Sequence, residues 1–372
     1  MISLPYPFSK PFNKSRTDAS PNSLKQLASL CDDPQVADFV STYNNLTTRR
    51  ERTPSSRFTK PNYTNYKPPK YPIILCHGLS GFDTLILIPS VRTFINVISN
   101  AVSYKNSEYF VMDETDNEVK KNVLEVEYWI GVKRILESKG CTVFITKVPP
   151  FGSIEERATS LNKILNTVVN QQLQTKNDKI TKLNFIAHSM GGLDCRYLIS
   201  RIPENEKNYE VASLTTLSTP HGGSEVANYV VGQFGKIRKS LNDNGPLLPM
   251  CYYQLTTYYA QYFNNITPND PDVKYFSYGA YFSPKWYSSF ALTWSIINYA
   301  TNGEPNDGMV TVKSSHWGKY MGTLPNMDHL DIINWRNKFH DTFEQLLQNK
   351  KNPESILQLY VNITNDLAEQ GC

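Results

Sequence analysis

The sequence predicts an α/β fold built on a mostly parallel, doubly wound sheet. Continuous apolar segments lie at 72–76, 141–148, 183–187 and 211–217, and helical patterns separate them. A parallel strand is covered on both faces, so a continuous apolar run fits it better than an alternating one. Strands that alternate with helices predict βαβ units, and we therefore expect helices on both faces of the sheet.

The helices between these strands carry recognisable start and stop signals. Apolar residues recur at helical spacing through 123–139, and Gly140 follows as a stop signal. Ser153 and Glu156 have the spacing of a capping box, which predicts the start of the next helix. A further helix is predicted from Gly191 onward.

The length of 372 residues is compatible with one α/β domain that carries insertions. Residues 1–70 are basic and rich in proline, serine and asparagine, and we predict a largely unpacked N-terminal segment and linker. The α/β domain is then expected to span 71–372. It would include a lid or cap insertion around 224–282 and helices at the C-terminal end.

The charge balance and hydropathy exclude several classes of protein. The 38 Lys and Arg residues against 34 Asp and Glu residues give a net charge of only +4, too small to suggest a nucleic acid partner. No run of 18 or more apolar residues occurs, so we expect no transmembrane span.

The first 22 residues are compatible with two interpretations. Lys10, Lys14 and Arg16 occur among serines, with no acidic residue before Asp18, a composition typical of mitochondrial transit segments. Prolines at positions 5, 7 and 11 interrupt the amphipathic helix that such a segment needs, so a basic disordered tail fits equally well. Mitochondrial location is the expectation, with a cytoplasmic location or one at the surface of membranes or lipid droplets as the alternative.

Six cysteines are scattered without the spacing of a metal site. Several lie inside predicted strands or helices, so we predict reduced thiols in the core and no disulfide framework. They are Cys31, Cys76, Cys141, Cys195, Cys251 and Cys372.

Ser189 is the candidate nucleophile. It follows the apolar segment 183–187 and precedes the helix predicted from Gly191, so it lies on a strand-to-helix turn. Such a turn strains the serine backbone and requires small residues two positions before and after it, here Ala187 and Gly191. The alanine departs from the G-x-S-x-G pattern, and an ordinary turn serine is the alternative while this stretch is considered alone.

A serine nucleophile needs a base, a group that orients the base, and donors for the oxyanion. Asp307 lies in the turn-type tripeptide Asn306-Asp307-Gly308, just before a strand predicted at 309–312. A tight turn suits a carboxylate that must be held in one place. Asp307 is therefore the candidate orienting acid.

Three late histidines are candidates for the base. His340 falls within a helix predicted at 331–347, and His316 lies beside the strand predicted at 309–312. His329 lies in the loop just before that helix and is free to reach Ser189. A structural role remains the alternative for each histidine.

Several stretches, in this order, resemble the true lipases of the α/β-hydrolase superfamily. The likeness extends over about 71–349 and is closer to the mitochondrial triacylglycerol lipases of yeast than to the bacterial members. The residues that carry it are Tyr71 to Leu79, Tyr128 to Gly140, Ala187 to Gly192, Thr219 to Ser224, Asn306 to Gly308 and His329 to Asp331.

The resemblance implies roles for particular residues. Ser189, Asp307 and His329 would form the catalytic triad, and the backbone N–H groups of Leu79 and Met190 would bind the oxyanion. An ester would then be cleaved through an acyl-enzyme.

The sequence departs from the bacterial members near the acid and the base. Asp331 matches one ligand of their calcium ion, but Ser283-Pro284 stands where the second aspartate is expected. Lys313 stands where a bridging cysteine is expected. We therefore expect no cofactor and interpret Asp331 as the N-terminal cap of the helix predicted after it, with a calcium ligand as the alternative.

The expected function is hydrolysis of triacylglycerol by a serine lipase at a membrane or droplet surface, with diacylglycerol and short-chain esters as further substrates. The tyrosine-rich insertion at 224–282 suits a surface that meets lipid, although many of its tyrosines could equally pack in the core. Two alternatives remain from the sequence. One is a lipid acyltransferase or phospholipase on the same fold, and the other is a non-catalytic lipid-binding protein.

Overall fold

The computed structural model describes residues 66–79, 128–173, 180–240, 248–284, 288, 290–335 and 356–372. The chain divides into two compact units, 1–50 and 51–372, and every described residue belongs to the second. Within these ranges, no helix is long and apolar enough to cross a membrane.

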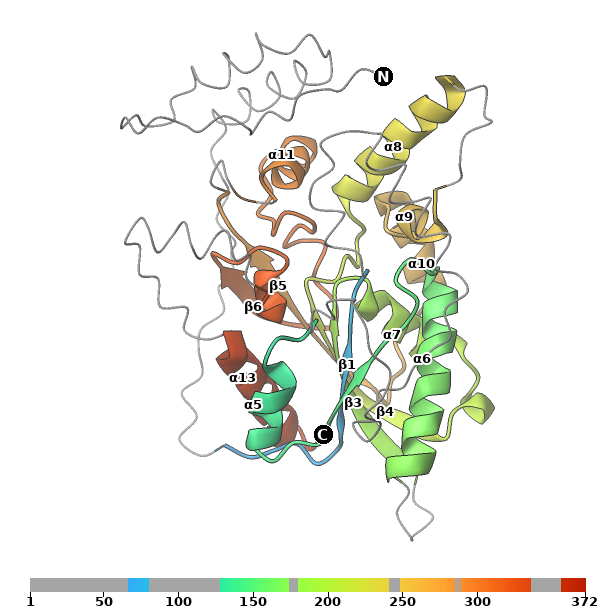
Figure 1. Cartoon of the computed structure of the whole chain (residues 1–372), viewed down its shortest axis with the longest axis vertical. Helices are drawn as coiled ribbons and strands as arrows, with labels where there is room; N and C mark the ends of the chain where they lie inside the picture. The colour runs from blue at the N-terminus through green and yellow to red at the C-terminus, as the bar shows by residue number, and fades with distance from the viewer. Residues whose placement is uncertain are drawn as a thin grey trace, which may run out of the picture. The chain divides into compact units, whose positions relative to one another are not determined.

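The described part of the chain is organised around one six-stranded sheet in the order β2-β1-β3-β4-β5-β6 (Figure 1). All five pairings between neighbouring strands are parallel. The predicted doubly wound parallel sheet is thus confirmed. The strands are β1 Ile73–Cys76, β2 Val143–Thr146, β3 Thr181–His188, β4 Tyr209–Leu217, β5 Lys274–Tyr281 and β6 Lys319–Pro325.

Helices connect these strands and also build a cap between β4 and β5. The connecting and terminal helices are α5 Val132–Ser138, α6 Ile154–Val168 with the turn η2 Val169–Leu173, α7 Gly191–Arg201, η3 Glu204–Glu206, α11 Ala291–Ala300, η4 Asp331–Ile333 and α13 Ile356–Glu369. The cap consists of α8 Glu225–Ser240, α9 Met250–Gln254 and α10 Thr257–Ile266.

The two faces of the sheet are buried in two different apolar clusters. Ile73 and Leu75 pack with α5 and α13, whereas Ile74 packs with α6 and α7 (Figure 1). Neighbouring residues of β1 therefore point to opposite faces, and all three side chains are completely buried. Each such side chain contributes about 1.5–3 kcal/mol on burial, which explains why the strand must be apolar throughout.

The helix starts follow local rules. Ser153 Oγ accepts a hydrogen bond from Glu156 N at 3.1 Å, and Glu156 Oε2 accepts one from Ser153 N at 2.9 Å. The predicted capping box is therefore present at the start of α6. The helix predicted over 123–139 is helical only from Val132 within the described residues, because Gly131 turns the chain with φ 71°.

The α/β domain begins earlier than the predicted boundary at Tyr71. Tyr66 Oη is hydrogen bonded to Thr364 Oγ1 at 3.0 Å, and Lys67 N donates to Asn365 Oδ1 at 3.0 Å. Lys70 N donates to the carbonyl of Cys372 at 2.6 Å. The end of the predicted linker thus packs on α13 and on the last residue.

Two other predictions need correction, and a third lies mostly outside the described residues. The predicted insertion at 224–282 is too long, because its last part forms β5 in the sheet. Residues 309–312 form turns and only an isolated bridge from Asn306 to Thr311, and the strand in this region is β6 instead. Of the helix predicted at 331–347, only the first turn η4 lies within the described residues.

The described cysteines have free thiols in the core, as predicted. They are Cys76, Cys141, Cys195, Cys251 and Cys372. Cys31 lies outside the described residues.

Gly191→Ala should destabilise the fold, because a Cβ at this position would lie 2.6 Å from the His77 carbonyl oxygen and 2.7 Å from that of Cys76. These are backbone atoms, so we expect a loss of about 1–3 kcal/mol in the free energy of unfolding, measured with urea. Gly232 in α8 is the control, since no atom lies within 4 Å of its added Cβ. Gly232→Ala should instead stabilise by about 0.5–1 kcal/mol. An equal rise in the free energy of unfolding in both variants would contradict the steric argument.

Candidate active site

Ser189 occupies a strained turn between β3 and α7. Its φ angle is 55°, in the left-handed region that residues other than glycine rarely adopt. Ser189 N donates to the Leu217 carbonyl at 3.0 Å, and Thr219 Oγ1 donates to the Ser189 carbonyl at 2.7 Å. The β4 strand and the loop after it thus hold the backbone of the serine on both sides.

The structure brings Ser189, His329 and Asp307 together. His329 Nε2 lies 2.9 Å from Ser189 Oγ, and His329 Nδ1 lies 2.8 Å from Asp307 Oδ2. Ser189 is 7% exposed, and the two partners are completely buried. The three predicted residues form one hydrogen-bonded line within the low-dielectric interior, where electrostatic interactions are stronger than in water.

The turn Asn306-Asp307-Gly308 fixes the carboxylate. Asp307 Oδ1 accepts hydrogen bonds from Met309 N at 2.9 Å and Val310 N at 2.7 Å. Oδ2 faces His329, and the Asp307 carbonyl also accepts from His329 N at 2.9 Å. An acceptor held at Nδ1 favours the imidazole tautomer whose Nε2 can accept the serine proton.

His316 and His221 have surroundings different from those of His329. His316 stacks against Tyr320 with ring centroids 3.6 Å apart, and burial lowers its pKa. His340 lies outside the described residues. His221 is hydrogen bonded to Arg196 Nη1 at 3.3 Å and to Thr216 Oγ1 at 3.1 Å. Of the two late histidines that the structure describes, His329 is the one that reaches Ser189.

His188 precedes the serine and packs beside the imidazole of His329, with ring centroids 4.5 Å apart. Its Nδ1 is hydrogen bonded to Tyr128 Oη at 2.7 Å. Burial, with a further contribution from His329, lowers the pKa of His188 well below its usual value. The neighbour of His329 is therefore a neutral ring, which does not oppose a positive charge on His329.

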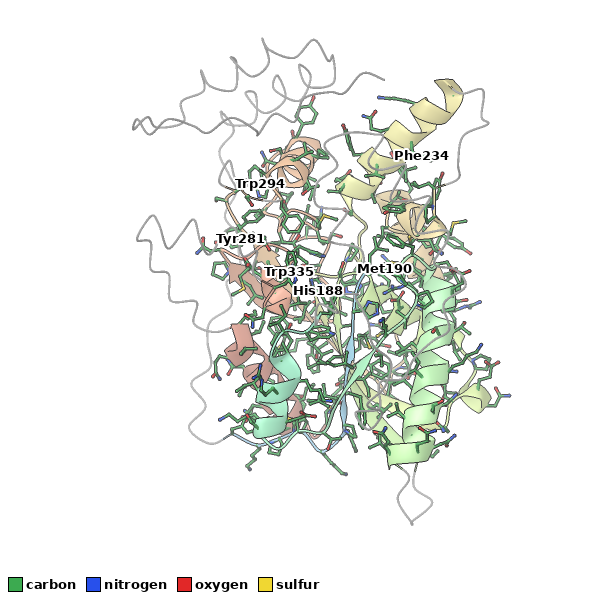
Figure 2. The ribbon with its side chains drawn as sticks, viewed as in Figure 1. His188, Met190, Phe234, Tyr281, Trp294 and Trp335 are labelled. Atoms are coloured by element: carbon green, nitrogen blue, oxygen red, sulfur yellow. The ribbon has the colours of Figure 1, made fainter. Side chains whose placement is uncertain are left out.

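Leu79 and Met190, the predicted oxyanion donors, are buried in one apolar cluster together with residues of the cap. Met190 and His188 lie near the carboxyl ends of the central strands, and Phe234 of α8 lies above them (Figure 2). The loop carrying Leu79 approaches the serine closely, since a Cβ added to Gly78 would lie 2.6 Å from Ser189 Cβ.

Two residues that the sequence did not single out for a role position this loop. His77 Nε2 accepts from Val148 N at 3.0 Å, so its Nδ1 can donate to the Gly78 carbonyl at 2.7 Å. Tyr128 Oη accepts from Gly78 N at 3.0 Å. Both side chains lie in stretches that suggested family likeness, but their contacts depend on tertiary structure.

Asp331 does not cap a helix in the predicted manner. Asp328 Oδ1 accepts from Leu330 N and Asp331 N, both at 2.9 Å, whereas Asp331 Oδ2 accepts from Asp328 N at 3.1 Å. The carboxylate that caps the turn η4 is thus Asp328. Among the described residues, no group of three or more His, Cys, Asp or Glu side chains could hold a metal ion.

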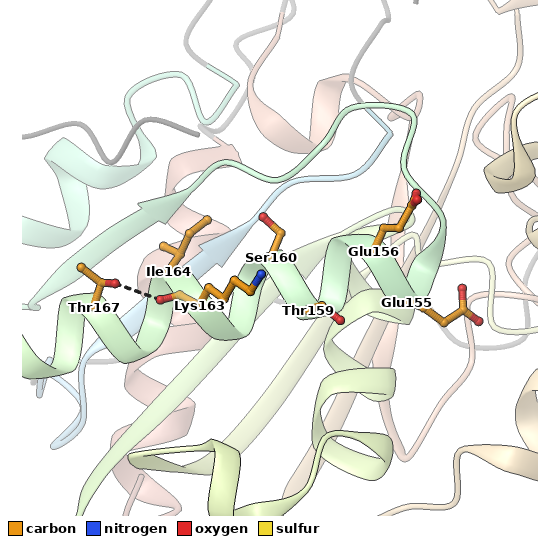
Figure 3. Close-up of a pocket in the computed structure, with 7 residues that line it drawn as sticks. All are labelled: Glu155, Glu156, Thr159, Ser160, Lys163, Ile164 and Thr167. Atoms are coloured by element: carbon orange, nitrogen blue, oxygen red, sulfur yellow. Dashed lines mark hydrogen bonds between the residues drawn. The ribbon is translucent and has the colours of Figure 1, made fainter. Parts of the chain in front are cut away.

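A hollow of about 560 Å³ runs along the outer side of α6 (Figure 3). Neither the three residues Ser189, His329 and Asp307 nor the loop that carries Leu79 contributes to the described lining. We therefore assign the acyl chain no place there. The described lining residues are Glu155, Glu156, Thr159, Ser160, Lys163, Ile164 and Thr167.

A parallel sheet, a strained serine after its third strand and the line from Ser189 to Asp307 define an α/β-hydrolase with the site of a serine hydrolase. Solved structures share this fold. Staphylococcus hyicus lipase is 18% identical with a TM-score of 0.51, covering 83% of this chain and 98% of that one. A metagenomic carboxyl esterase is 17% identical with a TM-score of 0.53, covering 86% and 81%.

The sequence comparisons identify the family. Residues 155–301 match the serine esterase family DUF676. The chain is 54% identical over 311 residues to Triacylglycerol lipase 2 of Saccharomyces cerevisiae, covering 82% of this chain and 94% of that protein. It is 27% identical over 319 residues to a triacylglycerol lipase of Vibrio cholerae, and the match covers 75% of this chain and 84% of that protein. The chain belongs to this family of serine lipases.

His77 should make stability depend on pH. Burial, with the nearby charges of Arg157 and Lys147, lowers its pKa to about 3, against 6.5 for the ordinary group. Between these values the unfolded chain binds a proton at His77 and the folded chain does not. Stability from this residue is therefore lost as pH falls from 6.5 toward 3, by up to about 1.4 kcal/mol per pH unit.

The measurement is urea unfolding between pH 4 and 7. His77→Gln should reduce the slope of unfolding free energy against pH by that amount. His316→Gln is the control, because His316 is exposed and its pKa is lowered less than that of His77. An unchanged slope in His77→Gln would contradict the protonation argument.

Proposed function

We propose that this chain hydrolyses the ester bonds of triacylglycerol, with diacylglycerol and short-chain esters as further substrates. The observation that carries this proposal is the buried hydrogen-bonded line from Ser189 through His329 to Asp307. Membership of a family of serine lipases supports the choice of an acylglycerol as substrate.

In the first half of the reaction, Ser189 Oγ attacks the ester carbonyl carbon while His329 Nε2 takes the hydroxyl proton. Asp307 Oδ2 stabilises the resulting imidazolium through the proton on Nδ1. The carbonyl oxygen becomes an oxyanion, which the N–H groups of Leu79 and Met190 bind. The tetrahedral intermediate then collapses, and His329 returns the proton to the departing glycerol oxygen.

In the second half, water cleaves the acyl-enzyme. His329 removes a proton from water as the water oxygen attacks the acyl carbon, and the same N–H groups bind the second oxyanion. Ser189 leaves with the proton from His329, releasing a fatty acid. Each half thus uses the same base and the same pair of donors.

We also propose that the cap meets the lipid–water interface. Four of its side chains are exposed although they are large and apolar in part: Tyr229 at 48%, Met250 at 58%, Tyr258 at 78% and Tyr262 at 57%. A tyrosine places an apolar ring in lipid and its hydroxyl in water, so these residues suit such a boundary. Other tyrosines of the 224–282 region, including Tyr252 and Tyr275, pack in the core.

Substitutions in the line of three residues test the reaction. Ser189→Ala should abolish hydrolysis of triolein, and Asp307→Asn should lower kcat by about 10⁴-fold because the wrong imidazole tautomer is favoured. Product analysis of triglycerides, diglycerides and phospholipids separates a lipase from a phospholipase. An acceptor alcohol in one arm reveals acyl transfer. Full activity in Ser189→Ala would refute the proposal.

The same assay tests our proposal that no calcium is needed. The support comes from Asp328 and Asp331, whose oxygens accept backbone N–H groups. EDTA should therefore leave the rate unchanged. A loss that calcium restores would contradict this proposal.

Interfacial activity tests the cap. With tributyrin, the rate should rise when the substrate exceeds its solubility and forms an emulsion. The double substitution Tyr258→Ser and Tyr262→Ser should reduce this rise without changing hydrolysis of dissolved ester. Ile180→Ser is the control, because Ile180 is 61% exposed at the opposite, amino end of β3. An equal loss on dissolved ester would refute the proposed role of the tyrosines.

We further propose a mitochondrial location, supported by the basic, serine-containing composition of residues 1–22. Residues 1–22 fused to a fluorescent protein should direct it to mitochondria. Replacing Lys10, Lys14 and Arg16 with glutamine should abolish this targeting. A diffuse distribution of the unaltered fusion would contradict the proposal.

A further inference from the structure

Arg157 places a buried positive charge behind the loop that carries Leu79. Its side chain is completely buried, and its Nη2 donates to the carbonyl oxygens of His77 at 2.9 Å and Gly78 at 3.0 Å. Burying a guanidinium is costly unless its donors find partners. Arg157 directs two of its contacts to consecutive carbonyl groups of this one loop.

The contact with Gly78 has a direct geometric consequence. The carbonyl of Gly78 and the N–H of Leu79 belong to the same planar trans peptide group, so they point in opposite directions. Any group that fixes the carbonyl therefore fixes the direction of the N–H. Two groups donate hydrogen bonds to this carbonyl oxygen: Arg157 Nη2 at 3.0 Å and His77 Nδ1 at 2.7 Å.

Arg157 also ties this loop to the helix that follows Ser189. Its Nε donates to Asp194 Oδ2 at 2.9 Å, and Asp194 lies in the first turn of α7. Asp194 N in turn donates to the Met190 carbonyl at 3.2 Å. One guanidinium thus links the segments that supply the two N–H donors, which must keep a fixed separation to bind one oxyanion.

The cap holds the start of α6, which carries Arg157. Gln254 at the end of α9 is 3% exposed, and its Oε1 accepts from Ile154 N at 2.7 Å. Its Nε2 donates to Glu155 Oε2 at 2.7 Å, and Tyr259 Oη donates to Glu155 Oε1 at 3.2 Å. The first turn of α6 is therefore hydrogen bonded to two residues of the cap region, through Ile154 and Glu155, which lie three and two positions before Arg157.

We propose that Gln254 and Arg157 are positioning residues that act as one unit, through which the cap region sets the direction of the Leu79 N–H. The inference rests on the proposed function, since it concerns the oxyanion of that reaction. A cap that keeps Gln254 bonded to α6 also keeps Arg157 against the Gly78 carbonyl. The Leu79 N–H then remains aimed at the carbonyl oxygen of the substrate. Displacing Gln254 loosens the donor without altering the line from Ser189 to Asp307.

Arg157→Lys keeps the charge beside Asp194 but removes the fork that spans several acceptors. Complete loss of an oxyanion donor costs about 10²–10³ in rate, so we expect kcat to fall by about 10–100-fold with KM changed by less than about threefold. Affinity for a trifluoromethyl ketone, which forms a tetrahedral adduct with Ser189, should fall by the same factor. Affinity for a non-hydrolysable ether analogue of the substrate should not change.

Gln254→Ala tests the cap end of the unit and is available if Arg157→Lys does not fold. It should lower kcat and ketone affinity together by about 3–10-fold, again with the ether analogue unaffected, because the donor is loosened rather than lost. In the double variant the two losses should be less than additive. Independent, additive losses would refute a single unit.

Two matched controls separate positioning from stability. Arg196 is also a buried arginine, but it donates to Asn264 Oδ1 at 2.8 Å and to the Thr267 carbonyl at 3.1 Å, away from the Leu79 loop. Asn228 bonds Thr257 within the cap. Arg196→Lys and Asn228→Ala should lower the urea midpoint while kcat per folded molecule and ketone affinity stay unchanged.

The outcomes also separate this inference from the proposed function. The positioning role is refuted if Arg157→Lys and Gln254→Ala only lower the urea midpoint, or if they weaken the binding of the ketone and of the ether analogue equally. Neither result would contradict the proposed roles of Ser189, His329 and Asp307. If the ketone does not bind wild type, or binds Ser189→Ala equally well, the proposed reaction itself fails.

Discussion

The site depends on the close approach of two backbone segments, the loop after β1 and the turn after β3. Gly78 lies against Ser189, and Gly191 lies against the carbonyls of Cys76 and His77, with no room for a side chain at either glycine. This contact brings the strained serine close to the loop that carries Leu79, one of the two proposed oxyanion donors. Tight packing of backbone against backbone leaves little room for adjustment, so the surrounding polar groups must hold both segments in place.

Burial then determines the protonation states around the reacting groups. His77 and His188 are buried and lose affinity for protons, so each remains neutral and can both donate and accept a hydrogen bond. Asp194 and the carbonyl oxygens of His77 and Gly78 surround the buried Arg157 guanidinium. The site therefore combines neutral rings near His329 with one buried cation behind the loop that carries Leu79, an arrangement that suits the oxyanion of the proposed reaction.

Local patterns predicted most of the framework. Some features depend only on residues that are close together in the sequence, and the structure has them where we expected them. They are the continuous apolar strands, the capping box at Ser153 and the turn at Asp307. The sequence did not reveal β6, whose glycine and proline weaken any strand pattern and whose place is set by pairing with β5. It also did not reveal Arg157 or Gln254, because their partners lie far away in the chain and no local spacing encodes them.

The contact between Lys70 and Cys372 fixes the place where residues 66–70 meet the sheet. Residues 66–70 enter at the amino ends of the strands, beside α13, whereas Ser189 lies at the carboxyl end of β3. Residues 66–70 are therefore separated from Ser189 by the length of the sheet, so substitutions in this entry segment can alter its packing on α13 without touching the groups around Ser189.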